Sequence, residues 1–150
     1  MRPDARAFTK PVRTKRRVAS VAAAAVAFGA LDAVWISQFA LPLYRAEVPH
    51  LLAESFEAAP ALVFYPAFTL GLVHLAVRPD EERTLGARVR DGAVFGGVAY
   101  ATWSLTGKAI LKDLTWPVAL ADLGWGLAVG AAMAAAAHLV MRTRCAGGRG

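Results

Sequence analysis

The sequence predicts an all-α integral membrane protein, a four-helix bundle with a short surface helix between its first and second spans. Three observations predict this class. The chain has 150 residues, of which 57% are apolar and 19% charged, and its mean hydropathy of +0.43 is high for a soluble domain. Four apolar segments are each long enough to cross the roughly 30 Å hydrocarbon core as a helix. The Lys and Arg residues gather at the two ends of the chain and in one loop.

Prolines and polar runs separate the four predicted spans. The spans cover residues 18–41, 60–77, 92–111 and 117–141. Pro60 and Pro117 fall in the first turn of the second and fourth spans, where the missing N–H costs no helical hydrogen bond. The chain therefore divides into a basic tail at 1–17, a transmembrane domain at 18–141 and a second basic tail at 142–150.

The segment between the first two spans, residues 42–59, carries apolar residues at helical spacing. Leu51, Leu52 and Phe56 alternate there with acidic residues. This spacing predicts a short helix that lies on the outer membrane surface. A simple connector is an equally good interpretation of the same residues.

The distribution of basic residues predicts the orientation of the chain in the membrane. Seven Lys and Arg residues lie in the first tail, four in the loop 78–91 and three in the second tail, whereas only Arg45, Lys108 and Lys112 fall on the other side. The positive-inside rule then places both termini in the cytoplasm, with the lipid bilayer as the main partner of the chain. The first tail and the following apolar stretch could also form a signal peptide, but apolar residues continue through Leu41, past any plausible cleavage point.

Asp32 lies in the middle of the first span, within the stretch "GALDAVWISQ". An aspartate costs roughly 2.5 to 3.5 kcal/mol at the centre of a membrane helix, which the apolar residues of this span offset only narrowly. Asp32 should therefore face the inside of the bundle, with a partner or a proton. The candidate partners are Lys108, Tyr65 and Tyr100.

The polar residues of the other spans fall in the same outer half of the predicted bundle. Asp122 lies near the outer end of the fourth span, and the stretch "ADLGW" repeats the acid-to-tryptophan spacing of "LDAVW". An acid and an indole three residues apart share one helix face, so Trp35 and Trp125 should flank the two aspartates. The sequence thus predicts one polar cluster lined by tryptophans.

Small residues predict close packing between the third and fourth spans. Gly92 and Gly96 are four residues apart in the third span, and Gly126, Gly130 and Ala134 continue this spacing in the fourth. Such small-xxx-small lines let helix backbones approach each other in lipid.

Several blocks of the chain resemble a family of small bacterial integral membrane proteins with four predicted spans and no known function. The blocks are "LDAVWI", "YR" at 44–45, "FYPAF", "GAVFGGVAYATWSLTGKA", "WP" at 116–117 and "LADLGWG". The resemblance implies the fold and a location in the bacterial inner membrane, and it implies no activity. Its characteristic polar positions fall on Asp32, Trp35, Tyr44, Tyr65, Tyr100, Thr106, Trp116, Asp122 and Trp125.

The chain departs from the family pattern in the third span. Where the family has tyrosine-aspartate-leucine-threonine-asparagine, this chain has Trp103, Ser104, Leu105, Thr106 and Gly107, followed by Lys108. An acid and an amide are therefore missing, and the local charge shifts away from acidic.

Together these observations predict a ligand-binding site for a small amphiphile or lipid. Its residues are Asp32, Trp35, Tyr65, Tyr100, Trp103, Ser104, Thr106, Lys108, Asp122 and Trp125. A proton- or ion-coupled transporter subunit working as an oligomer is one alternative. A structural bundle whose buried charges fix the helix packing is another, and a homo-oligomer is left open in each case.

The sequence favours a non-enzymatic protein without cofactor, metal or nucleic-acid partner. No nucleophile-base-acid spacing or metal-ligand cluster is present, and the single cysteine, Cys145, lies in the second tail. The basic residues lack the aromatic interleaving of a nucleic-acid site. His74 and His138 fall at similar depth and could together ligate a haem, but two histidines form no motif and their interfacial position explains both.

Overall fold

The computed structural model describes residues 10–146, and the described part of the chain is helical without strands. The all-α class predicted from the sequence is therefore confirmed. Two helices contain π-helical turns, labelled η1 and η3, and η2 is a single 3-10 turn. The elements are α1 (Lys10–Trp35), η1 (Ile36–Ala40), α2 (Leu41–Glu47), η2 (Pro49–Leu51), α3 (Ala58–Leu72), η3 (Val73–Val77), α4 (Leu85–Ile110) and α5 (Trp116–Ala146).

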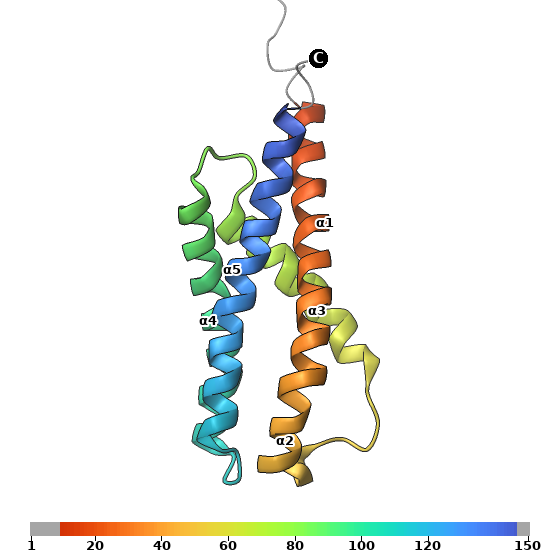
Figure 1. Ribbon diagram of the computed structural model, residues 1–150, viewed down its shortest axis with the longest axis vertical. Helices are drawn as coiled ribbons and strands as arrows, with labels where there is room; N and C mark the ends of the chain where they lie inside the picture. Colours follow the sequence, from red (N-terminus) through yellow and green to blue (C-terminus); the bar gives the residue numbers. More distant parts are fainter. Residues whose placement is uncertain (1–9, 147–150) are drawn as a thin grey trace, which may run out of the picture.

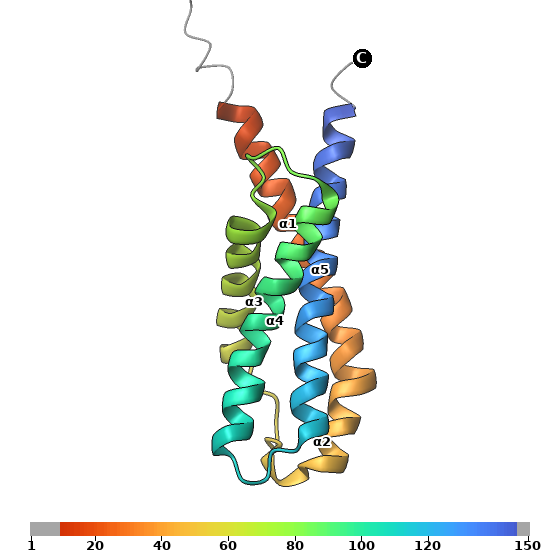
Figure 2. The same ribbon diagram turned by 90° about the vertical axis from the view of Figure 1, so that its left-hand side faces the viewer.

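The helices form an elongated bundle in which α1, α4 and α5 run along the long axis and α3 crosses α1 at an angle (Figures 1 and 2). The first turn of α1, the last turn of α5 and the loop between η3 and α4 lie at one end of the molecule. We call this the basic end, because it contains Lys15, Arg16, Arg17, Arg78, Arg83, Arg88, Arg90 and Arg142. The helix α2 and the turn between α4 and α5 lie at the other end, the α2 end.

Within residues 10–146, three helical segments are long and apolar enough to cross a membrane. They are Thr14–Glu47, which joins α1, η1 and α2, then Ala58–Val77 and Trp116–Arg142. Large apolar side chains on their outer faces, such as Val26 and Leu62, are exposed, as expected where lipid rather than water surrounds a helix. The fourth predicted span, 92–111, lies inside α4, and its crossing of the membrane stays a prediction.

The structure differs from the sequence-based expectation in the loop 42–59. Residues 1–9 and 147–150 of the predicted tails lie outside the described residues, and Lys10–Arg17 form the first turns of α1. In the loop, α2 continues α1 directly through η1, and residues 52–57 are not helical. The helical spacing of Leu51, Leu52 and Phe56 therefore does not correspond to a helix.

The helices α4 and α5 pack most closely, through the glycines that the sequence pattern indicated. A Cβ atom at Gly96 would lie 2.1 Å from the carbonyl oxygen of Gly126, and one at Gly130 would lie 2.1 Å from that of Gly92. These distances leave no room for a side chain, so the two backbones are in direct contact. The glycines fix the distance and register of α4 against α5.

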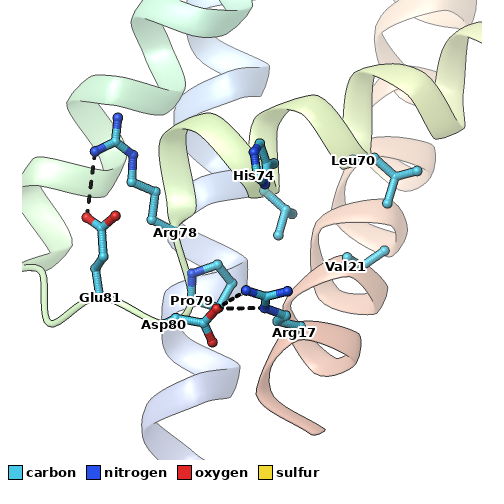
Figure 3. Close-up of a pocket in the computed structure, with 9 residues that line it drawn as sticks. Arg17, Val21, Leu70, His74, Arg78, Pro79, Asp80 and Glu81 are labelled. Atoms are coloured by element: carbon cyan, nitrogen blue, oxygen red, sulfur yellow. Dashed lines mark hydrogen bonds and ion pairs between the residues drawn. The ribbon is translucent and has the colours of Figure 1, made fainter. Parts of the chain in front are cut away.

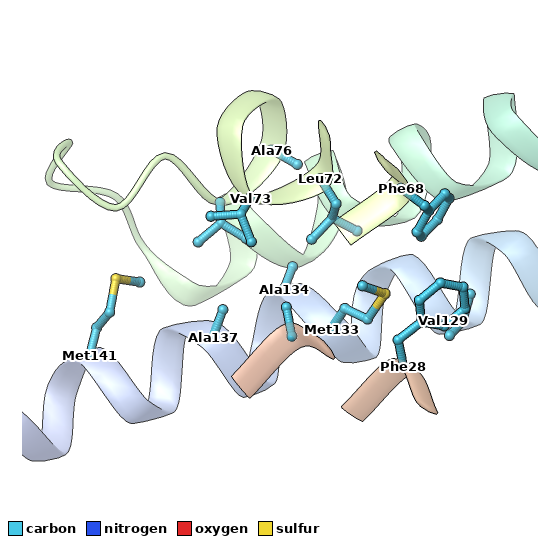
Figure 4. Close-up of a cluster of buried hydrophobic side chains, with 12 residues drawn as sticks. Phe28, Phe68, Leu72, Val73, Ala76, Val129, Met133, Ala134, Ala137 and Met141 are labelled. Carbon is cyan, nitrogen blue, oxygen red and sulfur yellow. The ribbon is translucent and has the colours of Figure 1, made fainter. Parts of the chain in front are cut away.

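The main apolar core lies between α1, α3 with η3, and α5 (Figure 4). Phe28 of α1 contacts the ring of Phe68, with a 5.0 Å distance between the centroids, and Met133 and Val129 of α5 lie beside them. Burial of such side chains stabilises by about 1.5 to 3 kcal/mol each in water, but in lipid their contribution comes from close contact instead. This core holds α3 and η3 against α1 and α5.

A buried arginine closes the loop between η3 and α4 at the basic end. Arg88 is only 3% exposed and lies in the second turn of α4. Its Nε donates to the carbonyl of Val77 at 2.7 Å, its Nη2 to that of Glu81 at 2.7 Å, and its Nη1 to that of Arg83 at 3.0 Å. Arg88 thus ties the whole loop to α4.

Candidate functional site

Asp32 of α1 is 5% exposed and accepts hydrogen bonds from two other helices. The hydroxyl of Tyr65 of α3 donates to Asp32 Oδ2, and the indole Nε1 of Trp125 of α5 donates to Oδ1 at 2.8 Å. Both carboxylate oxygens therefore have protein partners. The expectation that Asp32 faces the bundle and is partnered agrees with this geometry, and it joins three helices at one point.

The two tryptophans that follow the two acids stack on each other. The rings of Trp35 and Trp125 lie 4.8 Å apart between centroids, with planes within 3° of parallel. Phe39 also stacks on Trp35, with 5.6 Å between the ring centroids. Stacked rings at these distances are favourable contacts, and they form one wall between α1 and α5.

Asp122 of α5 is 8% exposed and lies on the α2 side of the same wall. The hydroxyl of Tyr44 of α2 donates to Asp122 Oδ2 at 2.5 Å. Tyr44 is held in place because it packs on a second apolar cluster, formed by Val48, Leu114 and Val118. Asp122 Oδ1 has no hydrogen-bond partner among the described residues, so this oxygen is open to the adjacent pocket.

A pocket of about 290 Å³ separates the two aspartates. Its polar lining comes from the two acids, Tyr44, Tyr100 and the two stacked indoles, and its apolar lining from η1, α2 and Leu52. Among its lining residues there is no lysine or arginine. The full lining is Asp32, Trp35, Ile36, Ala40, Leu41, Tyr44, Leu52, Tyr100, Asp122 and Trp125. We call it the aspartate pocket.

Half of the predicted site residues line this pocket. They are Asp32, Trp35, Tyr100, Asp122 and Trp125, while Tyr65 supports Asp32 from α3. Trp103 and Thr106 are exposed on α4, although the indole of Trp103 lies beside the hydroxyl of Tyr44 at the edge of the site. Ser104 is buried, and its hydroxyl donates to the carbonyl of Tyr100 at 2.8 Å. These three α4 residues do not line the pocket.

Of the three candidate partners of Asp32, Tyr65 donates to it, whereas Lys108 lies elsewhere. Lys108 makes no ion pair within the described residues, and its Nζ lies 5.9 Å from the ring centroid of Trp116, a cation–π contact. The reason is geometric. Tyr100 lies near Asp32, since both line the aspartate pocket. Lys108 is eight residues further along α4, which displaces it from Tyr100 by about 12 Å along the helix axis and about 80° around it.

The family model described as "Predicted membrane protein (DUF2177)" matches residues 17–139, most of the chain. The chain belongs to this family. The chain has no match among curated proteins or solved structures. The DUF2177 family has no assigned function, so its match establishes a predicted membrane protein and leaves the role of the aspartate pocket to its geometry.

Tyr44 is the polar lining residue of this DUF2177 protein that the sequence-based site omitted; the apolar residues Ile36, Ala40, Leu41 and Leu52 were also not part of it. Tyr44 follows a proline in the segment 42–59, where no periodic pattern connects it to Asp122. The resemblance already placed Tyr44 among the characteristic polar positions, and this was the available signal. The continuous helix of α1, η1 and α2 lines the pocket both before and after the π turn η1. This turn inserts an extra residue before Pro42, whose missing N–H breaks the regular hydrogen-bond pattern.

His74 and His138, the two histidines considered above as haem ligands, have separate surroundings in this DUF2177 protein. Arg88 Nη1 lies 2.7 Å from His138 Nδ1, so this nitrogen accepts a hydrogen bond and cannot bind a metal. His74 is exposed on η3, beside α1. Within the described residues there is also no group of three or more His, Cys, Asp or Glu side chains that could hold a metal ion.

A double-mutant cycle tests the separation of Lys108 from Asp32. We expect Asp32→Asn to lower the melting temperature in detergent and Lys108→Met to change it little, with additive effects in the double variant, because the two groups share no contact. Recovery of stability in the double variant would instead show that the charges form a pair.

Proposed function

We propose that this DUF2177 protein is a four-span protein of the bacterial inner membrane that binds the polar head of a small amphiphile in the aspartate pocket. The observation that carries this proposal is the composition of the pocket, which combines two carboxylates, two tyrosines and a tryptophan stack in about 290 Å³. Pockets that recognise small molecules commonly have mostly apolar walls with a few polar groups that converge.

The charge of the lining supports a cationic head group, such as a protonated amine. The pocket contains Asp32 and Asp122 but no lysine or arginine. The oxygens of Asp32 are already occupied by Tyr65 and Trp125, whereas Asp122 Oδ1 is open. In this proposal Asp122 accepts a hydrogen bond from the ligand, and Asp32 fixes the walls.

The position of the pocket supports an approach from the outer leaflet. The start of α1, the loop before α4 and the end of α5 lie at the basic end (Figure 2). The aspartate pocket lies toward the opposite end, the α2 end. With the basic end in the cytoplasm, the α2 end faces the other side of the membrane. The apolar lining residues Ile36 and Leu41 then contact the alkyl chain of a ligand.

A structural role is a second candidate for Asp32 alone. Its two hydrogen bonds join α1, α3 and α5, which is the geometry of a polar clasp inside a bundle. The two roles predict different variants. Asp32→Asn should mainly lower stability, whereas Asp122→Asn should mainly lower ligand affinity.

Ligand binding is tested with two amphiphiles that have the same alkyl chain. We expect dodecylamine, protonated at pH 7, to change the tryptophan fluorescence of the purified protein saturably, whereas dodecanoate should not. Asp122→Asn should weaken dodecylamine binding roughly tenfold, the value of one hydrogen bond to a charged group.

Asp113→Asn is the matched control for this experiment. Asp113 lies at the same end of the molecule and pairs with His50 at 3.3 Å, but it does not line the pocket. Its variant should bind dodecylamine like the unmodified protein. Equal binding of dodecanoate, or an equal loss in both variants, would exclude the aspartate pocket as a site for cations.

A further inference from the structure

A second hollow lies at the basic end, between α1 and the end of the α3 helix (Figure 3). It has a volume of about 360 Å³. Val21, Leu70 and Val73 form its apolar floor, and Arg17, His74 and Asp80 surround its polar edge. Arg78 points away from it toward Glu81, with which it forms an ion pair.

This hollow continues along the bundle into a neighbouring one. This neighbouring hollow has a volume of about 340 Å³ and shares Val21 and Leu70 with the hollow at the basic end. Its remaining lining is Ala25, Tyr65, Pro66 and Thr69. Together they form one groove that runs about 12 Å along α1 from Arg17 to Ala25, at 1.5 Å per residue. We call it the α1/α3 groove.

The groove exists because α3 crosses α1 at an angle (Figure 1). Near the crossing, the rings of Phe28 and Tyr65 hold the two helices together, with centroids 4.7 Å apart. Toward the basic end the helices separate, and the small residues Ala25 and Thr69 do not fill the space between them. The groove is therefore narrow, apolar along its length and polar at one end only.

The polar end offers hydrogen-bond donors that the protein does not use. Arg17 is 63% exposed, and its Nε and Nη2 both donate to the same oxygen, Asp80 Oδ2, with Nε at 2.7 Å. Among the described residues, Arg17 Nη1 has no acceptor, and the ring of His74 has no hydrogen-bond partner.

We infer that the α1/α3 groove binds a phospholipid, with the phosphate on Arg17 and His74 and one acyl chain along Val21, Leu70 and Pro66. The groove has unused donors beside the carboxylate of Asp80 at one end and apolar walls along the rest, so an acceptor-bearing head with an alkyl chain fits it. A phosphate carries only acceptors and a negative charge, which suits an arginine with a free N–H. This site differs from the aspartate pocket in position and in its arginine, which the aspartate pocket lacks, and it does not rest on the function proposed for that pocket.

Lipid binding is tested by native mass spectrometry of the protein in maltoside detergent. We expect dioleoyl phosphatidylglycerol to bind saturably, while dioleoylglycerol, which lacks the phosphate, and inorganic phosphate, which lacks the chains, bind at least tenfold more weakly. Arg17→Gln should weaken phosphatidylglycerol binding roughly tenfold, since it removes a charged hydrogen bond.

Asp80→Asn distinguishes a lipid contact from a purely structural ion pair. It removes the carboxylate that holds Arg17 but keeps the guanidinium, so lipid affinity should stay the same or rise. If Asp80→Asn weakens binding as much as Arg17→Gln does, the residues matter only through their ion pair and the proposal is overturned.

A second pair of variants tests the path of the acyl chain. Ala25→Phe places a ring in the groove, at an exposed position where folding should be unaffected, and should reduce phosphatidylglycerol binding. Ala22→Phe is the matched control, because Ala22 is also exposed on α1 but lies in a hollow beside α5. Equal binding by the two variants would show that the chain does not lie in the α1/α3 groove.

Discussion

Replacing Arg88 with methionine is expected to lower the free energy of unfolding by about 3 kcal/mol, because several buried carbonyl groups lose their donor at once. Arg88 donates to the carbonyls of Val77, Glu81 and Arg83, and it also bonds to His138 of α5. A methionine fills a similar volume but donates no hydrogen bond. Water can reach part of the loop, so the loss should stay below the sum of the individual bonds.

The loop that Arg88 holds has a backbone that needs such support. Arg78 adopts a left-handed conformation, with φ of 47°, directly after the π turn η3. A residue other than glycine pays about 1 to 2 kcal/mol in this region, so contacts elsewhere must maintain it. The bond from Arg88 to the carbonyl of Val77 fixes the peptide on the N-terminal side of this residue.

Two variants serve as controls for Arg88→Met when unfolding is followed by titration with dodecyl sulfate in mixed micelles. Arg90→Met removes an exposed arginine of the same helix and should cost less than about 0.5 kcal/mol. Arg88→Lys keeps the charge but has one donor atom, which cannot reach the three carbonyls together, so it should recover less than half of the loss. Full recovery with lysine would show that charge, and not the donor geometry, stabilises the loop.

The burial of Arg88 is a feature that the sequence does not predict. In the sequence it is one of four arginines in the loop 78–91, and a polar run of this kind predicts solvated charges that set the topology. The burial of one of the four depends on the path of the loop, which turns back over α4 at Arg78. No local pattern reports this tertiary contact.

The helical class followed from the sequence because each apolar segment is long and bounded by prolines or charges. The π turns did not, since η1 and η3 have no composition that separates them from regular helix. This matters for the site. The turn η1 lets α1 and α2 contact one pocket from two sides, which brings Tyr44 to Asp122.

The sequence predicts that the buried acid of the candidate site needs a hydrogen-bond partner, but it does not predict which residue is that partner. The cost of burying Asp32 predicts that it has a partner, and Tyr65 was among the candidates. The choice between Tyr65 and Lys108 depends on how α3 and α4 are rotated about their own axes. The sequence spacing within each helix does not determine this rotation. The bond from Trp125 to Asp32 joins residues 93 positions apart, so only the packing of α1 on α5 could reveal it.

The second large effect is expected at Gly96, where alanine should lower the free energy of unfolding by about 2 kcal/mol. A Cβ atom there would lie 2.1 Å from the carbonyl oxygen of Gly126, so α4 and α5 would have to separate. Tyr100 lies one turn further along α4 and lines the aspartate pocket, so this separation should also move its hydroxyl away from Asp32 and Asp122. We therefore expect Gly96→Ala to weaken dodecylamine binding as well as stability.

Gly124→Ala is the matched control, because no atom lies within 4 Å of the Cβ position at Gly124 on the exposed side of α5. The same glycine-to-alanine change there should leave stability unchanged or raise it by about 0.5 to 1 kcal/mol, since alanine restricts the unfolded chain and favours helix. Both variants are measured by the same titration with dodecyl sulfate. Equal stability of Gly96→Ala and Gly124→Ala would contradict direct contact between the α4 and α5 backbones. A loss of stability at Gly96 with unchanged dodecylamine affinity would instead show that the aspartate pocket does not depend on the register of these two helices.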